Sequence, residues 1–254
     1  MRPAMIASLM MYARPELDGA LGRYWALIRE GLRARGLQAP ERLSNEVPPF
    51  DVWQSPDLVL SQTCGMPYRT LLQDKVQLVG TPDYGLEDCP PGYYRSAIVV
   101  RADDPRDRLE AYRDARFAYN ESLSQSGFAA AYQVAQVAGF WFADRVQSHG
   151  HRNSAIAIAE GLADIATLDA MTWRLIRRHD GFADKLRVLG WTGPTPGLPY
   201  ITAGTTDPAP VAAAVREAIA ALEEADRAAL CLRGLVAIPG QEYLAIPNPP
   251  PEAG

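Results

Sequence analysis

The sequence predicts an α/β protein in which strands and helices alternate along the whole chain. Short runs of apolar and β-branched residues are followed by longer stretches whose apolar residues recur at helical spacing. Turns rich in serine, threonine and glycine separate several of these pairs, as is typical of helix starts. This alternation indicates strand–helix–strand units, so we expect parallel-dominated sheets. Composition alone does not decide between one sheet and two.

The overall composition is that of a globular protein with an acidic balance. The chain has 254 residues, of which 48% are hydrophobic, enough for one large or two small domains. A net charge of −5 and a pI near 5.3 argue against nucleic acid or an anionic membrane as a partner, because both require a basic face. No apolar segment approaches the ~20 residues of a membrane helix. We therefore expect neither nucleic-acid binding nor membrane insertion.

The cysteines give no sign of a metal site. Cys64, Cys89 and Cys231 form no CxxC pair, so neither a zinc site nor a disulfide framework is expected, although a single Cys64–Cys89 bridge stays open. No motif points to a cofactor, and we predict none.

The first residues form a short apolar run that leads into Tyr12. Because no small-x-small cleavage motif follows it, we interpret Met1 to Ala13 as the region of a first strand rather than as a signal peptide. This interpretation predicts a cytoplasmic protein. The alternative is a periplasmic protein whose export information lies outside this chain.

The first part of the chain contains an amphipathic helix between two apolar strands. Apolar residues at helical spacing predict the helix, and Gly36 is its expected stop. The loop over 81–94 is too long and too rich in Gly, Pro and Tyr for a simple connector, and such loops often line sites. In chain order we expect a strand within 4–11, a helix over 15–35, a strand over 57–61, a helix over 67–73, and strands over 76–80 and 96–101.

A second series of strand–helix units follows. Each strand is a short apolar run, and helix starts are marked by Ser124, by Ser148 to His151, by Asp169 and by Asp207 followed by proline. We expect a short helix toward 112, strands over 115–119, 141–147, 163–168, 186–191, 200–203 and 235–238, helices from 125, over 151–161 and 170–178, and one or two helices over 208–233. The Pro-rich segment 247–254 has nothing to bury.

Three turns between a strand and a helix could together hold an anion. They are Gln62 to Gly65, Ser124 to Gly127 and Ser148 to His151. In open α/β sheets ligands bind beyond the carboxyl ends of strands, where helix N-termini present unsatisfied N–H groups. A nucleotide site fits worse, since no GxGxxG follows the first strand and no GxxxxGK[ST] occurs. The alternative is three ordinary helix caps.

These motifs resemble, in order and over nearly the whole chain, the phosphate/phosphonate substrate-binding proteins of ABC importers. The residues that carry the resemblance are Leu60 to Gly65, Tyr94 to Val100, Asn120 to Gly127, Gly150-His151, Ala159 to Ala166, Asp169 and Leu189 to Thr192. It implies the type 2 periplasmic-binding fold, two α/β lobes joined by two crossover strands. Lobe one would be 1–97 plus 203–254 and lobe two 98–202, with hinges at Ser96–Arg101 and Tyr200–Gly204.

The resemblance also implies a set of ligand-binding residues. The oxyanion-binding serine turn falls on Ser124, Gln125 and Ser126, although relatives usually have Ser or Thr at the position of Gln125. The turn glycine falls on Gly127, the pocket histidine on His151 and the pocket carboxylate on Asp169. Two pocket tyrosines fall on Tyr12 and Tyr94, and the lobe-one turn contributes Thr63 and Gly65.

Several of these residues have a second interpretation. His151 could be a surface residue at a helix start, Asp169 could serve only as a helix cap, and core packing could explain Tyr12 and Trp191. Cys64 could be a reactive thiol at a helix N-terminus, but no paired base lies near it in the sequence.

Taken together, these features predict a binding protein that closes around a small oxyanion such as phosphate or an organophosphonate. It would have no catalytic residue, and an ABC permease is a candidate partner. The alternatives are a cytoplasmic lyase or isomerase on the same fold, with His151 or Asp169 as base, or a ligand sensor. Either would act on a small carboxylate or phosphorylated metabolite.

Overall fold

The computed structural model describes residues 5–251 and divides into two α/β units. The first comprises Met1–Tyr93 and Pro196–Ala245, and the second Tyr94–Thr195 and Ile246–Gly254. The prediction placed the boundaries a few residues later, after 97 and 202, and kept the tail in lobe one. The predicted hinge segments lie largely within strands: Ser96–Arg101 is strand β5, and Tyr200–Ala203 is strand β11.

The first unit contains a five-stranded mixed sheet. Its order is β1-β2-β11-β3-β12, formed by Ile6–Ser8, Leu58–Gln62, Tyr200–Ala203, Val76–Asp83 and Gly234–Val236. β1 pairs with β2 in parallel, and β11 runs antiparallel to both β2 and β3. The strands β1, β2 and β3 therefore point the same way, and their carboxyl ends share one edge.

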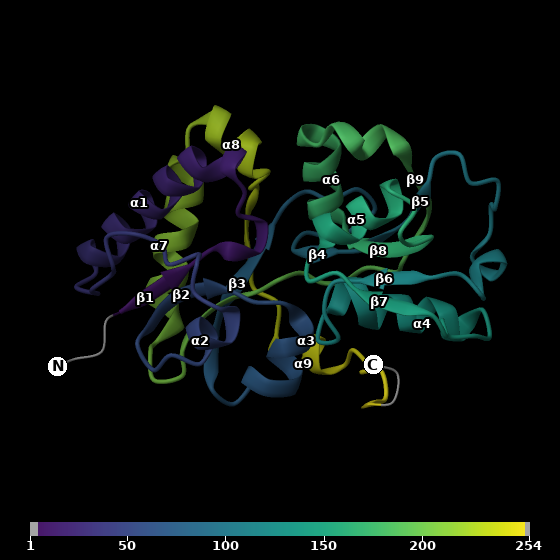
Figure 1. Ribbon diagram of the computed structural model, residues 1–254. Helices are drawn as coiled ribbons and strands as arrows, with labels where there is room; N and C mark the ends of the chain where they lie inside the picture. Colours follow the sequence, from purple (N-terminus) through teal and green to yellow (C-terminus); the bar gives the residue numbers. More distant parts are fainter. Residues whose placement is uncertain (1–4, 252–254) are drawn as a thin grey trace. The chain divides into compact units, whose positions relative to one another are not determined.

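Helices flank this sheet, and α1 and α7 pack together (Figure 1). A Cβ added to Gly31 of α1 would lie 3.1 Å from the Ala214 Cβ of α7, so the absence of a side chain allows this close approach. The amphipathic α1 buries Tyr24, Ile28 and Leu32. The helical elements of this unit are η1 (Met10–Tyr12), η2 (Pro15–Leu17), α1 (Asp18–Ala34), α2 (Pro49–Trp53), α3 (Gly65–Pro67), η3 (Tyr68–Leu72), α7 (Pro208–Ala221), α8 (Glu224–Leu230) and α9 (Gly240–Leu244).

The second unit contains another five-stranded mixed sheet, of order β7-β6-β8-β5-β9. These strands are Arg145–Gln147, Phe117–Tyr119, Ile165–Asp169, Ser96–Arg101 and Leu186–Trp191. β6 pairs in parallel with both β7 and β8, whereas β5 runs antiparallel to β8 and β9. A separate two-stranded sheet joins β4 (Tyr93–Tyr94) and β10 (Thr195–Pro196), where the chain passes between the units.

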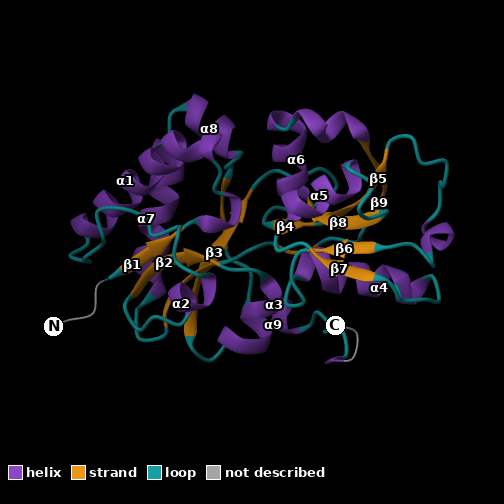
Figure 2. Ribbon diagram, in the orientation of Figure 1, coloured by secondary structure: helices purple, strands orange, loops and turns teal. Residues whose placement is uncertain are grey.

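Helices lie on both faces of this second sheet (Figure 2), and an apolar layer packs on each face. On one face Phe117 and Ile165 pack against Phe128 and the helix α4. On the other face strand residues pack against Ile158 of α5 and Trp173 of α6. The helical elements are η4 (Leu109–Tyr112), η5 (Gln125–Ala129), α4 (Ala130–Val137), α5 (His151–Ala159), α6 (Ala170–His179) and η6 (Gly181–Lys185).

The predicted α/β class is confirmed, but the expectation of parallel-dominated sheets is wrong. More of the strand pairs in the described part are antiparallel than parallel. The reason is that β5 and β11 form soon after the chain enters a new unit, so neither follows the strand–helix–strand repeat that makes parallel pairs. The strand expected over 141–147 is also shorter, because Trp141 and Phe142 join the aromatic cluster around Phe117.

No helix among residues 5–251 is both long and apolar enough to cross a membrane. The expected N-terminal strand begins at Ile6, while its predicted start at residue 4 and the end of the tail, 252–254, lie outside the described residues.

Replacing Phe117 by alanine should destabilise the second unit. The ring is fully buried and stacks on Phe142 with centroids 4.8 Å apart. Loss of a buried aromatic side chain and the resulting cavity typically cost about 3–5 kcal/mol of unfolding free energy. Urea unfolding of Phe117→Ala checks this, with Val137→Ala as the control, because Val137 is 92% exposed and its loss should change stability by less than about 0.5 kcal/mol. Equal stabilities of the two variants would contradict the packing described.

Candidate functional site

The parallel strands of the second unit bring three helix starts to one edge. β6, β7 and β8 point the same way, and each is followed by a helical element: η5 with α4, α5, and α6. This is the edge at which open α/β sheets bind ligands. The predicted turns at Ser124–Gly127 and Ser148–His151 therefore lie at the same edge as Asp169.

The serine turn is a capped and buried helix start. The Ser124 Oγ accepts a hydrogen bond from the Gly127 N–H at 3.0 Å, and Ser124, Gln125 and Ser126 are each at most 5% exposed. Gln125–Ala129 forms a single π-helical turn before α4 begins. Such turns occur frequently at functional sites.

His151 lies against this turn. Its Nε2 is 2.8 Å from the Ser126 Oγ, so the first residue of α5 contacts the start of η5 directly. A Cβ added to Gly127 would lie 3.0 Å from the His151 Cε1, which explains why glycine is needed there. The structure thus joins two of the predicted turns through a serine–histidine pair.

Burial lowers the pKa of His151 to about 4, while the nearby backbone of Thr167 favours the charged ring and opposes this shift. At neutral pH the imidazole is therefore uncharged. The ring contributes a hydrogen-bonding group rather than a fixed positive charge to the protein without ligand.

Two further polar groups lie close to the pair. The Asn120 Oδ1 and the Thr167 Oγ1 are buried, and neither has a hydrogen-bond partner in the described part of the chain. Asn120 covers Gly127, whose added Cβ would be 1.8 Å from its Oδ1. Thr167 is two residues from Ile165 on β8 and therefore lies on the same face of the strand, which packs against the layer of α4 and Phe128. Buried polar atoms usually have hydrogen-bond partners, so these two unsatisfied atoms are candidates for contact with a polar ligand.

Asp169 caps α6. One carboxylate oxygen accepts from the N–H groups of Met171 at 2.7 Å and Thr172 at 3.0 Å, and the residue is 2% exposed. Asp169 therefore acts as a helix cap, which the sequence analysis gave as the alternative to ligand binding. Trp191 does not belong to the core, since it is 39% exposed and stacks with the Arg95 guanidinium 4.3 Å above its ring.

The first unit has polar and aromatic residues at the corresponding edge of its own sheet. Thr63 is fully buried and donates its N–H to the Pro199 carbonyl, and Gly65 begins α3. Tyr12 follows β1, and its ring meets that of Tyr84 edge-on at 5.1 Å. These predicted residues follow the carboxyl ends of β1 and β2. Tyr94 is 3% exposed in β4.

Sequence reasoning missed Tyr84 as well as the roles of Asn120 and Thr167. Gln62 donates its Nε2–H to the Tyr84 hydroxyl at 3.1 Å and to the Leu198 carbonyl at 3.1 Å, so Tyr84 belongs to the edge of the first sheet. The unusual loop over 81–94 contains Tyr84, but no spacing singled it out. Asn120 lies within the serine motif, but the motif assigns it no role.

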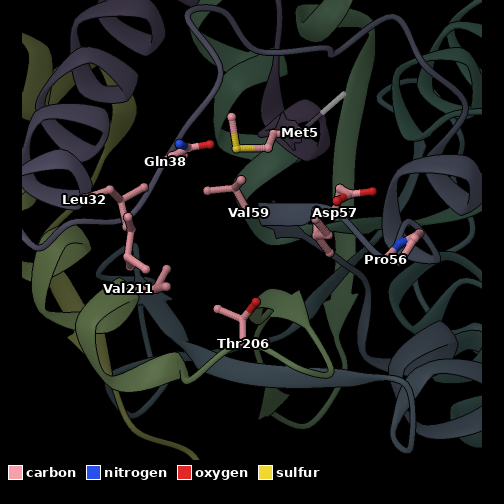
Figure 3. Close-up of a pocket in the computed structure, with 10 residues that line it drawn as sticks. Met5, Leu32, Gln38, Pro56, Asp57, Val59, Thr206 and Val211 are labelled. Carbon is pink, nitrogen blue, oxygen red and sulfur yellow. The ribbon is translucent and has the colours of Figure 1, made fainter. Parts of the chain in front are cut away.

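A pocket in the first unit lies elsewhere (Figure 3). It has a volume of about 210 Å³, and Leu32, Val59 and Thr206 surround it together with Asp57, at the amino end of β2. This is smaller than the roughly 300–1,000 Å³ of typical small-molecule sites. Because the predicted residues follow the carboxyl ends of the strands, this pocket is not part of the candidate site.

A family model described as the periplasmic substrate-binding protein of a phosphonate ABC transporter matches residues 59–240. A search of the curated proteins finds no match.

Solved structures show the fold. A Xanthomonas citri protein bound to chloride ion has a TM-score of 0.69 and 15% identity, covering 95% of this chain and 96% of its own. A binding component of a Pseudomonas aeruginosa ABC phosphonate transporter has a TM-score of 0.69 and 16% identity, covering 95% of this chain and 83% of its own. PhnD1 from Prochlorococcus marinus, in complex with methylphosphonate, has a TM-score of 0.70 and 12% identity, covering 94% of each chain. The chain therefore has the predicted two-lobe periplasmic-binding fold.

The low pKa of His151 makes a prediction about stability. A histidine whose pKa is about 4 in the folded protein and about 6.5 in the unfolded chain binds protons preferentially when unfolded between these values. The unfolding free energy should therefore fall as pH is lowered from about 6.5 to 4. Glutamine does not titrate, so the unfolding free energy of His151→Gln should not include this loss. The variant should therefore gain stability relative to wild type as pH is lowered from about 6.5 to 4. An NMR titration midpoint of the His151 ring at or above pH 6 would contradict the assignment.

Proposed function

Because the chain belongs to the family of periplasmic substrate-binding proteins of phosphonate ABC transporters, we propose that it binds a small phosphonate or phosphate at the serine turn of its second unit. The observation that carries this proposal is the Ser126–His151 contact at an edge where three helix starts converge. PhnD1, which has the same fold, is described in complex with methylphosphonate.

The turn supplies several hydrogen-bond donors. The first N–H groups of a helical segment have no intrahelical carbonyl partner, and the Ser126 N–H lies in this first turn. The hydroxyls of Ser124 and Ser126 are two further donors, and the helix dipole favours negative charge at this end. Such an arrangement of neutral donors suits an oxyanion.

The other predicted contacts remain proposals. Gly127 would let the anion approach the backbone, and the Gln125 amide would replace the hydroxyl that relatives usually have. For the first unit we propose contacts from Thr63, Gly65 and Tyr12 at the edge of its sheet. Tyr94 and Asp169 are weaker candidates, and the structure gives Asp169 a capping role.

Uptake would require a membrane partner. The family description names substrate-binding proteins of ABC transporters in the periplasm, which supports the periplasmic alternative over a cytoplasmic location and an ABC permease as partner. The same description does not favour the lyase or isomerase alternative, because its members bind substrates.

Removing either serine hydroxyl should weaken binding. Ser124→Ala and Ser126→Ala each delete a donor to a buried anion, and hydrogen bonds to charged groups contribute about 1.5–3 kcal/mol. We expect the Kd for methylphosphonate or phosphate to rise roughly tenfold or more in each variant, measured by calorimetry with whichever of the two ligands wild type binds.

A matched control separates ligand binding from helix capping. Asp207 caps α7 in the first unit by accepting from the Ala209 N–H at 3.0 Å. Asp207→Ala should therefore reduce stability by about 1 kcal/mol and leave the affinity unchanged. If Ser124→Ala and Ser126→Ala behave like this control, the serine turn is only a cap and the proposed site is wrong.

A further inference from the structure

We propose, on the basis of the function proposed above, that the site binds a dianionic ligand together with one proton, held in the row formed by the ligand oxygen, Ser126 Oγ and His151 Nε2. The starting observation is the 2.8 Å contact between the last two atoms. Hydrogen bonding, rather than a fixed charge, determines what this row can accept.

The surroundings of the ring determine where its hydrogen lies. The His151 Nε2 faces Ser126, whereas Nδ1 is fully buried. Nδ1 has no hydrogen bond of normal geometry in the described part of the chain, but the nearby backbone of Thr167 favours a hydrogen on the ring. On this basis we assign the hydrogen of the neutral ring to Nδ1, which leaves Nε2 as an acceptor for the Ser126 hydroxyl.

This arrangement opposes a fully deprotonated ligand. While Ser126 donates to His151, only its lone pairs are available to the ligand, and these repel an oxyanion. If Ser126 turned to donate to the ligand, its lone pairs would meet the lone pair of Nε2 at hydrogen-bond distance. One added proton, taken from solvent, resolves both conflicts, whether it resides on Nε2 or on the ligand oxygen.

The immediate surroundings supply no opposing charge. The side chains of Ser124, Gln125, Asn120 and Thr167 are neutral, and a desolvated dianion is costly in such a place.

Charged groups on the neighbouring elements are engaged elsewhere. On the β6 side Glu121 pairs with His149 at 3.2 Å, and Asp169 on β8 caps α6. On α5 itself Arg152 pairs with Asp180 at 2.7 Å. None of these ion pairs and caps involves His151, so a proton in the row is the positive charge that the geometry favours.

The test is proton uptake, measured by titration calorimetry in two buffers of different ionisation enthalpy. The probe is methylphosphonate, at a pH where it is mainly the dianion in solution. We expect wild type to take up about one proton per ligand bound, and the affinity to fall as pH rises. Uptake near zero in wild type would overturn the inference, whatever the variants do.

Three variants locate the proton. Ser126→Ala interrupts the row and His151→Gln offers an amide N–H in place of the ring, so both should reduce the uptake to near zero. His149→Gln is the matched control, because this neighbouring histidine is exposed and paired with Glu121, and it should retain the wild-type uptake. Full uptake in His151→Gln, or its loss in His149→Gln, would overturn the assignment.

The outcome is separable from the fate of the proposed function. If neither methylphosphonate nor inorganic phosphate gives binding heat with wild type at any pH, the proposed function itself fails and no proton uptake occurs. If methylphosphonate binds tightly without proton uptake, the proposed function stands and only the present inference is wrong.

Discussion

The parallel pairing of β6 with β7 and β8 is the constraint on which the candidate site depends. Parallel neighbours place their carboxyl ends, and hence the helices that follow them, at one edge. Residues 25 apart in the chain, Ser126 and His151, meet at hydrogen-bond distance for this reason. Phe117 and Ile165 lie opposite each other in the β6–β8 pair and pack into one apolar layer, which fixes the register of these two strands. The core thereby positions the polar groups at the carboxyl ends of the strands.

Much of this could be predicted from sequence, because helix starts and strands leave local signals. Serine before a helix predicts a cap, and Ser124 indeed accepts from the Gly127 N–H. The run over 96–101 forms a strand with the predicted bounds, since its apolar β-branched residues fit a sheet buried on both faces. The family was also recognisable, although the three similar solved structures share only 12–16% identity with the chain. The signals of helix starts and the spacing of apolar residues can therefore identify the family even when most side chains differ from those of its relatives.

The rest depended on packing between segments far apart in the chain. The direction of β11 follows from its return from the second unit, and no local pattern encodes that path. Tyr84 reaches Gln62 only because β2 and β3 end at the same edge. Asn120 and Thr167 became candidates because their buried oxygens have no partner in the described part, which is a property of the folded environment. The role of Asp169 as a helix cap was predicted as an alternative, and only its hydrogen bonds showed that it is filled.

Burial gives the same histidine two competing effects. Burial lowers the pKa of His151 and makes its charged form costly, whereas an anion bound at the proposed site beside Ser126 would favour that form. A histidine on an exposed helix start would feel the ligand less, because water would screen the anion. The close fit of Gly127 under Asn120 and beside His151 keeps the ring at this position, since any side chain there would displace one of them. The smallest residue in the turn thus holds the histidine where its charge state would respond to an anion bound at the proposed site.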